Sequence, residues 1–553
     1  MPTRSLILAS LAISVSIFAE TAPAPVKTAA AVEKDPVLIA MKAELERSKE
    51  KLVLPGMQRP YFIEYRLEDI AQFEASANFG ALVREDRTKQ KAVRVTVRIG
   101  DYKNDSSTVR GDGIVQIAPE DAEPAALRQV LWFATDEAYK NALRTYAAKQ
   151  ADLKRFQAPP TADDFSPAKP VIHIEPLVKL TMDEADWTKR IVEASGIYAS
   201  DERVNSFAPD IQFSSATVHG LAINRYTVNT EGTELRQGYT IYTAGVSLAS
   251  QAPDGMRLSR DNGTTATVPT EMESGKAFHE RVVRDLLSLR DLRNAPLVSD
   301  EDYHGPVLFS GDSSADIFNR LFVPNVEADK PAPGTTARTQ GAYTSSYHSR
   351  VLPEFLSVVD DPLMKTFAGK HLAGSYEVDD EGVPAQAVEV VSKGVLEHYL
   401  INRAPVKDVP QSNGHGRAAL AQRTQSRSGV MLVKPVKPVP AAQLHRRLVA
   451  MAKDQKRDFV YEAETLAGEL LPRLLYRVYR DGHRELVRGA VFDELDQRSM
   501  RSDIVAAGDD PYISMTVAPI PQTTIVPSLL FGQIGVKRAS PEQEKLPYYA
   551  PPQ

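Results

Sequence analysis

The sequence predicts an α+β protein with more than one domain. Apolar and polar residues alternate in residues 92–99 (AVRVTVRI), which is the pattern of a half-buried strand. Residues 127–146 instead carry apolar residues at helical spacing, which predicts a long helix. The two patterns mix without a repeat of fixed period, so the class is α+β. At roughly 150 residues per domain, 553 residues suggest three or four units, and we expect at least two domains.

Composition excludes several kinds of chemistry. The chain has no cysteine, so a disulfide framework, a thiolate metal site and a cysteine nucleophile are all excluded. The net charge is −6 with 25% charged residues, which is ordinary for a globular protein. The basic segment 417–427 (RAALAQRTQSR) has no interleaved aromatic residues, so we do not expect nucleic-acid binding.

The N-terminus resembles a secretory signal peptide. Arg4 precedes the uncharged run 5–18 (SLILASLAISVSIF), and Ala19 supplies a small residue for cleavage. The run is shorter than a membrane-spanning helix, and no cysteine is present for lipid attachment. We therefore expect a signal peptide at 1–19, a flexible spacer at 20–35, no stable membrane span, and a periplasmic or extracellular protein.

The remaining chain divides by pattern into segments. The N-terminal α/β region, 36–157, has helical spacing at 37–52, strand patterns at 61–69, 73–84 and 92–99, and the long helix from 127 to about 156. A polar, proline-bearing stretch at 158–170 reads as a linker. The region 171–300 shows a helix at 182–194, β-rich sequence at 211–258 and a helix at 277–292.

The last large segment, 301–540, is expected to be β-rich. Strand patterns occur at 307–309, 387–392, 475–479 and 513–517, with one clear helix at 441–453. Residues 326–346 are rich in Pro, Gly, Thr and Ser and predict a long loop, and residues 541–553 form a tail.

No local motif identifies an active site. The nearest match to a zinc-peptidase helix is His279-Glu280, but Val283 and Arg284 stand where a second histidine is needed, so His279 is interpreted as a surface residue. The other histidines are scattered, which leaves open a metal site assembled from distant residues. The segment 310–314 (SGDSS) lacks the Gly-x-Ser-x-Gly pattern, and we expect its serines to cap a helix. The acidic segment 379–382 (DDEG) is either an acid/base or cation site or a polar turn in which Gly382 supplies a positive φ.

Several segments, in their order along the chain, resemble the TldD/PmbA (TldE) family of metallopeptidase-related proteins, also described as modulators of DNA gyrase. The segments are 229–234 (NTEGTE), 253–255 (PDG), 304–309 (HGPVLF), 360–362 (DDP), 379–384 (DDEGVP), 393–400 (KGVLEHYL), 412–414 (SNG) and 523–530 (TTIVPSLL). The resemblance covers about residues 180–538. It implies that 171–300 is a TldD/PmbA-like N-terminal or central domain and that 301–540 is the family's C-terminal domain.

The departures from the family pattern concern the metal site. In the catalytic TldD branch, the strand resembling 304–309 leads into a helix with His-Glu-x-x-x-His, and a later cysteine completes the site. Here the corresponding residues 314–321 (SADIFNRL) contain neither histidine nor glutamate, and the chain has no cysteine. The resemblance therefore implies the PmbA/TldE-like branch, with no catalytic residue, no metal ligand and no cofactor in this chain, and with zinc only in a catalytic partner.

On this interpretation the chain is the non-catalytic subunit of an exported heteromeric peptidase, with a TldD-like subunit and a peptide substrate as partners. The acidic turn Asp379, Asp380, Glu381 and Gly382 and the turn Asn413 and Gly414 are then expected to shape a groove that binds an extended peptide. Two alternatives stay open: a hydrolase in its own right with an atypical metal site, and an envelope protein that binds peptides or acts as a scaffold.

Overall fold

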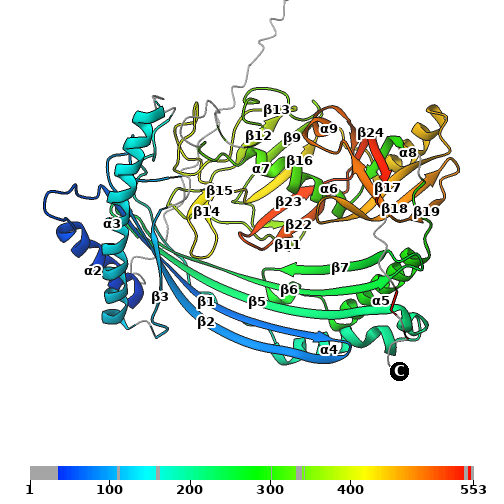
Figure 1. Cartoon of the computed structure of the whole chain (residues 1–553), viewed down its shortest axis with the longest axis horizontal. Helices are drawn as coiled ribbons and strands as arrows, with labels where there is room; N and C mark the ends of the chain where they lie inside the picture. The colour runs from blue at the N-terminus through cyan, green and yellow to red at the C-terminus, as the bar shows by residue number, and fades with distance from the viewer. Residues whose placement is uncertain are drawn as a thin grey trace, which may run out of the picture.

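The computed structural model describes residues 35–108, 112–121, 123–156, 162–299, 302–331, 339, 341, 343–540, 546–547 and 549. The expected signal peptide lies outside the described residues, as do nearly all of the expected spacer and most of the tail. The described part forms an N-terminal domain around one long curved sheet and a C-terminal domain of two sheets above it (Figure 1).

The N-terminal sheet has seven strands. They are β1 (Phe62–Asn78), β2 (Ala81–Arg98), β3 (Ile114–Ala118), β4 (Ile172–Ile174), β5 (Ile211–Asn229), β6 (Glu234–Gln251) and β7 (Arg257–Ala266). Their order is β3-β2-β1-β5-β6-β4, with β7 pairing to β6. β1 pairs with β2 and with β5 in antiparallel register over almost its whole length, which gives the sheet a continuous centre.

Two pairs of helices cover the outer face of this sheet. They are α2 (Pro36–Lys51) with α3 (Pro124–Phe156), and α4 (Glu184–Ser200) with α5 (Gly275–Asn294). Short 3-10 turns, η1 (Asn205–Asp210) and η2 (Pro269–Glu271), follow α4 and β7. Alternate residues of β1 explain the arrangement, because Ile63, Tyr65 and Leu67 are buried with α2 and α3, whereas Phe73, Ala75 and Ala77 are buried with α4 and α5.

The opposite face of β1 is charged where it meets the C-terminal domain. Glu64, Arg66 and Glu68 alternate with the apolar residues and are nonetheless buried. Buried charges need partners, so this face determines how the two domains join.

The C-terminal domain contains one six-stranded and one seven-stranded sheet, which share a core. One sheet has the order β13-β12-β9-β16-β23-β22, and the other has the order β19-β18-β17-β8-β24-β20 with β21 pairing to β24. The strands are β8 (Tyr303–Phe309), β9 (Leu356–Asp360), β12 (Val388–Ser392), β13 (Val395–Leu396), β16 (Val430–Pro435), β17 (Phe459–Ala467), β18 (Leu471–Tyr479), β19 (Arg484–Val487), β20 (Ala490–Asp493), β21 (Ile504–Ala507), β22 (Tyr512–Thr516), β23 (Gln522–Val526) and β24 (Leu529–Arg538).

Short helices and hairpins complete the C-terminal domain. The helices are α6 (Asp312–Ile317), a π-helical turn η3 (Phe318–Phe322), α7 (Val323–Val326), α8 (Ala441–Asp454) and α9 (Gln497–Ser502). The separate hairpins are β10 (Thr366–Phe367) with β11 (Lys370–His371), and β14 (Gly416–Ala418) with β15 (Thr424–Ser426). Buried residues of both sheets, η3 and α7 form one apolar core.

Two expectations about the first half differ from the structure. The expected strand 73–84 crosses the turn at Phe79 and Gly80, where both residues have positive φ and β1 gives way to β2. The expected linker 158–170 does not separate two sheets, because β1 before it pairs with β5 after it. In its described part, Phe165 is buried against the Arg403 guanidinium at 4.0 Å. Nine of the 21 residues of the expected loop 326–346 lie outside the described residues.

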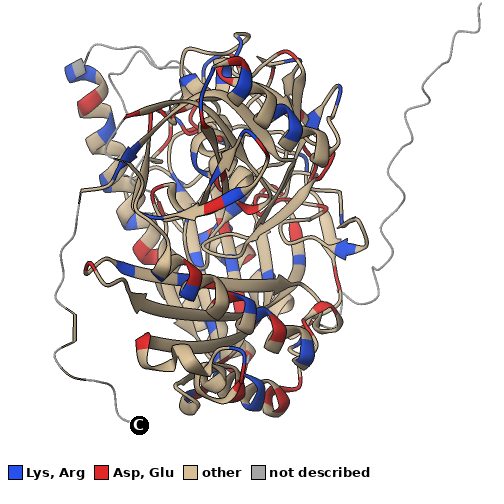
Figure 2. Cartoon of the chain, turned by 90° about the vertical axis from the view of Figure 1, so that its right-hand side faces the viewer, with Lys and Arg blue, Asp and Glu red and all other residues tan. Residues whose placement is uncertain are grey.

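The helices of the described chain are amphipathic or short, and none of them has the length and apolar character that crossing a membrane requires. In the view of Figure 2, acidic and basic residues are interspersed over both domains.

Candidate functional site

The acidic turn 379–382 lies at the junction of the two domains and is buried. Asp379 Oδ1 accepts hydrogen bonds from the backbone N–H groups of Glu381 at 3.0 Å and Val383 at 2.8 Å. Gly382 has φ +83°, and a Cβ there would lie 2.6 Å from Thr233 Cγ2 of the N-terminal domain. The expected turn with a left-handed glycine is present, and it packs directly against the neighbouring domain.

Asp380 connects the two domains through an ion network. Its Oδ2 lies 2.5 Å from Arg225 Nη1 and 3.4 Å from Arg417 Nε, and accepts from the Ala418 N–H at 2.8 Å. Arg225 also contacts Glu68 at 2.9 Å. Burial alone would raise the pKa of Asp380, but the guanidiniums of Arg225 and Arg417 outweigh it and lower the pKa to about 2. Asp380 is therefore ionised and fully committed to structural partners.

Glu381 and Asp379 are in a different electrostatic situation. Glu381 Oε2 accepts from the Arg403 N–H at 2.7 Å, while the Arg403 guanidinium binds Glu231 at 2.7 Å. Burial raises the pKa of Glu381 to about 7, with Arg403 opposing the rise. Burial and the neighbouring Glu381 carboxylate raise the pKa of Asp379 well above its usual value. One turn thus holds an ionised carboxylate beside two that resist ionisation.

The turn at Asn413 and Gly414 is close to the acidic turn and is also structural. Asn413 Oδ1 accepts from the Ile401 N–H at 2.9 Å, and its Nδ2 donates to Tyr399 O at 2.8 Å. Gly414 has φ +77°, and a Cβ there would lie 2.4 Å from Pro384 O. The structure therefore brings the six expected groove residues together, but their side chains bind the protein itself and the three carboxylates are at most 7% exposed.

The hairpin formed by β14 and β15 completes this junction. Its backbone carbonyl at Ala418 accepts from Arg225 Nη2 at 3.0 Å, and the N–H of Ala421 donates to Glu68 Oε2 at 2.6 Å. Arg66 Nη1 donates to Thr424 Oγ1 at 3.2 Å. The basic segment 417–427 is therefore used within the molecule.

Helix α6 stands where the family resemblance places the metal-binding helix. It follows β8 and presents Asp312 and Asp316 one helical turn apart. Burial raises the pKa of both, that of Asp316 to about 7 with the Asp312 charge adding to the rise. In the chain as described, no group of three or more His, Cys, Asp or Glu is arranged to hold a metal ion.

The serines beside α6 do not cap it. Gly311 occupies the N-cap position, and no side chain caps the helix there. Ser313 Oγ instead donates to the carbonyls of Ser310 or Ala463, at 2.8 and 2.7 Å, and Ser314 Oγ donates to Phe309 O at 3.0 Å. The capping expectation is wrong because these hydroxyls are buried and satisfy strand carbonyls.

Sequence reasoning missed one buried constellation of polar side chains. Asp360 Oδ1 lies 3.1 Å from His415 Nε2, and its Oδ2 accepts from Ser428 Oγ. The aspartate, not the histidine, contacts the serine, so the order required of a nucleophilic triad is absent. All three side chains are completely buried. Asp360 lies 55 and 68 positions from His415 and Ser428, so no local sequence signal could have joined it to them. His279 lies at the surface, 2.9 Å from Asp201, as expected.

Residues 302–456 match the family model described as the PmbA/TldA metallopeptidase C-terminal domain. Among solved structures, the chain is similar to a modulator of a DNA gyrase from Thermotoga maritima, with a TM-score of 0.61 and 17% identity over 90% of this chain and 99% of that one. TldE from Thermococcus kodakarensis is matched with a TM-score of 0.58 and 13% identity over 91% of this chain and 100% of the other. A modulator of DNA gyrase from Bacteroides thetaiotaomicron gives 0.56 and 13% over 91% and 98%. No curated protein sequence matches the chain significantly.

These matches show a C-terminal domain of the metallopeptidase-related family and an α+β fold that is shared over nearly the whole length of the solved structures. The family match over residues 302–456, together with the shared fold, confirms the resemblance to the TldD/PmbA family that the ordered motifs carry.

Proposed function

We propose that this chain is the non-catalytic, PmbA/TldE-like subunit of an exported heteromeric metallopeptidase that degrades peptides. The observation that carries the proposal is the composition of helix α6, where Asp312 and Asp316 occupy one face and no histidine or cysteine is available to hold zinc. The metal, and the water it activates, would come from a partner with His-Glu-x-x-x-His. The likeness to TldE supports this branch of the family.

The edge of the N-terminal sheet offers a surface for such a partner. Residues 81–90 of β2 pair with β1 on one side, whereas β3 covers only residues 91–95 on the other, so within the described strands the second side is unpaired. The hairpin end next to this edge exposes Phe79, Leu82 and Val83 at 46%, 48% and 61%. Unpaired edges and exposed apolar side chains are suited to adding a strand from another chain.

The proposal is tested by measuring metal content and association together. The mature chain is purified alone and after co-production with a His-Glu-x-x-x-His family member from the same organism, and zinc is measured by elemental mass spectrometry. About one zinc per heteromer, none in the isolated chain, and chelator-sensitive peptide hydrolysis only in the complex are expected. A partner with its motif histidines replaced is the control, because it should still associate but bind no zinc.

A pair of surface substitutions tests the docking edge. Leu82→Lys with Val83→Lys should weaken association at least tenfold, because it places charges where an added strand would pack. Val436→Lys, at a position 59% exposed on the C-terminal domain, is the matched control and should leave association unchanged.

Two outcomes would replace this proposal with its alternatives. About one zinc in the isolated chain, with chelator-sensitive activity, would make the protein a hydrolase in its own right. Failure to associate with any His-Glu-x-x-x-His protein would leave an envelope peptide-binding or scaffold protein. Export is checked separately from the periplasmic fraction by intact mass, which should show the loss of residues 1–19.

A further inference from the structure

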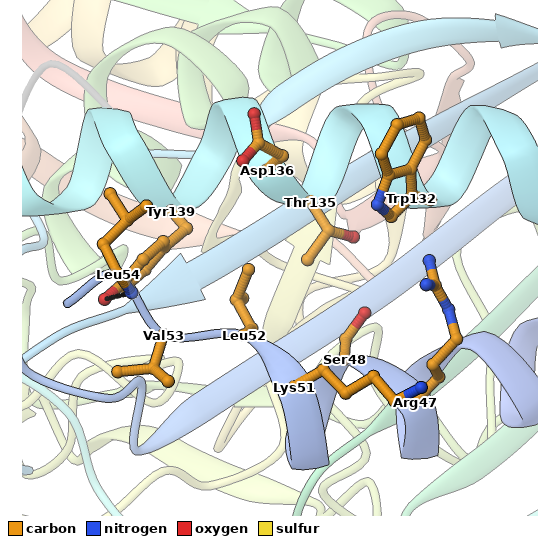
Figure 3. Close-up of a pocket in the computed structure, with 10 residues that line it drawn as sticks. All are labelled: Arg47, Ser48, Lys51, Leu52, Val53, Leu54, Trp132, Thr135, Asp136 and Tyr139. Carbon is orange, nitrogen blue, oxygen red and sulfur yellow. Dashed lines mark hydrogen bonds between the residues drawn. The ribbon is translucent and has the colours of Figure 1, made fainter.

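A cavity of about 190 Å³ lies between α2 and α3, on the outer side of the N-terminal domain (Figure 3). It is lined by Arg47, Ser48, Lys51, Leu52, Val53, Leu54, Trp132, Thr135, Asp136 and Tyr139. Taking about 30 Å³ per water, it has room for roughly six waters, or for one side-chain-sized group. It lies outside the domain junction and outside helix α6, so it is independent of the proposed function.

Part of the cavity wall is apolar, and some of its side chains are exposed to solvent. Leu52, Val53 and Leu54 approach it from the segment after α2, and Trp132 and Tyr139 approach it from α3. Trp132 is 45% exposed, whereas the second tryptophan of the chain, Trp187, is 5% exposed. An exposed tryptophan beside exposed leucine and valine at the mouth of a cavity is typical of a ligand site.

The floor of the cavity is formed by buried hydroxyl groups. The Thr135 hydroxyl lies 2.9 Å from the Tyr65 hydroxyl and 2.6 Å from Leu131 O, and the Tyr65 hydroxyl donates to Ser48 Oγ at 2.9 Å. Ser48 is 7% exposed and lines the cavity, and the Tyr65 hydroxyl is the partner that the described residues give its Oγ. The chain of hydroxyls therefore ends at the cavity in Ser48, whose hydroxyl can donate to a bound ligand while it accepts from Tyr65.

One cation at the rim is unmatched. Arg47 binds the buried Glu44 through Nε at 2.9 and 3.0 Å, and Asp136 is bound by Lys140 at 2.6 Å. Lys51 has no ion pair or hydrogen bond with any residue that the structure describes. Figure 3 shows the Ser48 hydroxyl pointing from α2 toward α3, with Arg47 rising beside it and Lys51 lying along α2. Lys51 and Ser48 both line the cavity, so an ammonium and a hydroxyl are available to a single ligand.

We propose that this cavity binds a small carboxylate with an apolar body of about the size of one amino acid. The apolar group would lie between Leu52 and Trp132, and the carboxylate would accept from the Ser48 hydroxyl and from Lys51. Two sources share this chemistry: the C-terminal residue of a peptide and a free amphipathic acid.

Trp132 fluorescence provides the test, because the other tryptophan of the chain, Trp187, is buried and does not line the cavity. N-acetyl-phenylalanine is titrated against N-acetyl-phenylalanine amide and against Ala-Ala-Phe with a free C-terminus. The acid should change the fluorescence saturably and bind at least tenfold more tightly than the amide, and Trp132→Phe should abolish the signal. Equal binding by Ala-Ala-Phe would support peptide C-termini as the source, and weaker binding would support a free acid.

Single substitutions test the polar end of the site. Lys51→Met and Ser48→Ala should each weaken binding of the acid, Lys51→Met by about tenfold or more, without changing the far-ultraviolet circular dichroism. Lys49→Met is the matched control, since this exposed lysine of α2 lies outside the cavity and pairs with Glu46 at 3.7 Å. Equal affinity for acid and amide, unchanged binding by Lys51→Met, or no saturable signal at millimolar acid would overturn the proposal.

Discussion

Replacement of Asp380 by asparagine removes the charge that joins the C-terminal domain to the long sheet. The wild-type carboxylate is 2% exposed and faces Arg225 at 2.5 Å and Arg417 at 3.4 Å. Asparagine can still accept from the Ala418 N–H through its carbonyl, so the turn itself should form. The variant therefore leaves two buried guanidiniums with less compensating charge, and Arg225 keeps Glu68 as an ion-pair partner and the Ala418 carbonyl as an acceptor.

The size of the effect follows from two arguments. The pKa of Asp380 is lowered from 3.8 to about 2, and at 1.36 kcal/mol per unit this corresponds to about 2 kcal/mol of stability at neutral pH. Removing one partner of a buried ion pair costs about 3–5 kcal/mol, because the other charge is left uncompensated. We expect Asp380→Asn to lower the free energy of unfolding by about 2–4 kcal/mol.

Urea unfolding followed by circular dichroism measures this change. Glu193→Gln is the control, because it makes the same carboxylate-to-amide change in an exposed pair with Lys189 at 3.7 Å and should cost less than about 0.5 kcal/mol. A lowered pKa means that the contribution is present above the unfolded pKa near 3.8 and is lost as the pH falls toward 2. An Asp380→Asn protein as stable as the control at pH 7, or a difference that does not shrink below pH 4, would refute this account of the junction.

Two further predictions concern the same turn. Gly382→Ala should lower the free energy of unfolding in urea by about 1–3 kcal/mol, because the new Cβ would sit at positive φ and 2.6 Å from Thr233. Gly56→Ala is the control: it has φ +76° with no atom within 4 Å of its Cβ, so it measures the cost of the positive φ alone and should cost clearly less. For Glu381, a raised pKa means that its contribution is complete below the unfolded pKa of about 4.5 and is lost as the pH rises through about 7. Over that interval the free energy of unfolding of wild type should fall by roughly 3 kcal/mol more than that of Glu381→Gln, because other carboxyls with raised pKa values, such as Asp316, titrate in both proteins. Parallel pH profiles of the two proteins would contradict this.

Much of the secondary structure could be predicted because its signals are local. The expected helices at 441–453 and 277–292 correspond to α8 and α5 within a few residues, since periodic apolar positions mark a helix wherever it packs. The prediction of one strand at 73–84 was wrong, and the reason is also local. The turn uses Phe79 with Gly80 instead of the Asn-Gly or Asp-Gly that usually marks a two-residue hairpin, so the β pattern continues through it.

For the candidate site, the sequence predicted the backbone conformation of the turn but not the surroundings of its side chains. The four residues 379–382 form the expected turn, and Gly382 has the expected positive φ. What the sequence did not indicate is burial, because the compensating residues Arg225 and Arg417 come from other parts of the chain. The same limit applies to Phe165, whose polar surroundings in sequence conceal its contact with Arg403.

The two acidic features of this chain carry their charges in opposite ways. At the junction, Asp380 is held ionised by guanidiniums of both domains, so its charge is required for the domains to join. On α6, burial disfavours ionisation of Asp312 and Asp316, and the described chain provides no third ligand around them. The junction is thus specified by charges that the fold must keep, whereas on α6 burial works against the charges of both carboxylates.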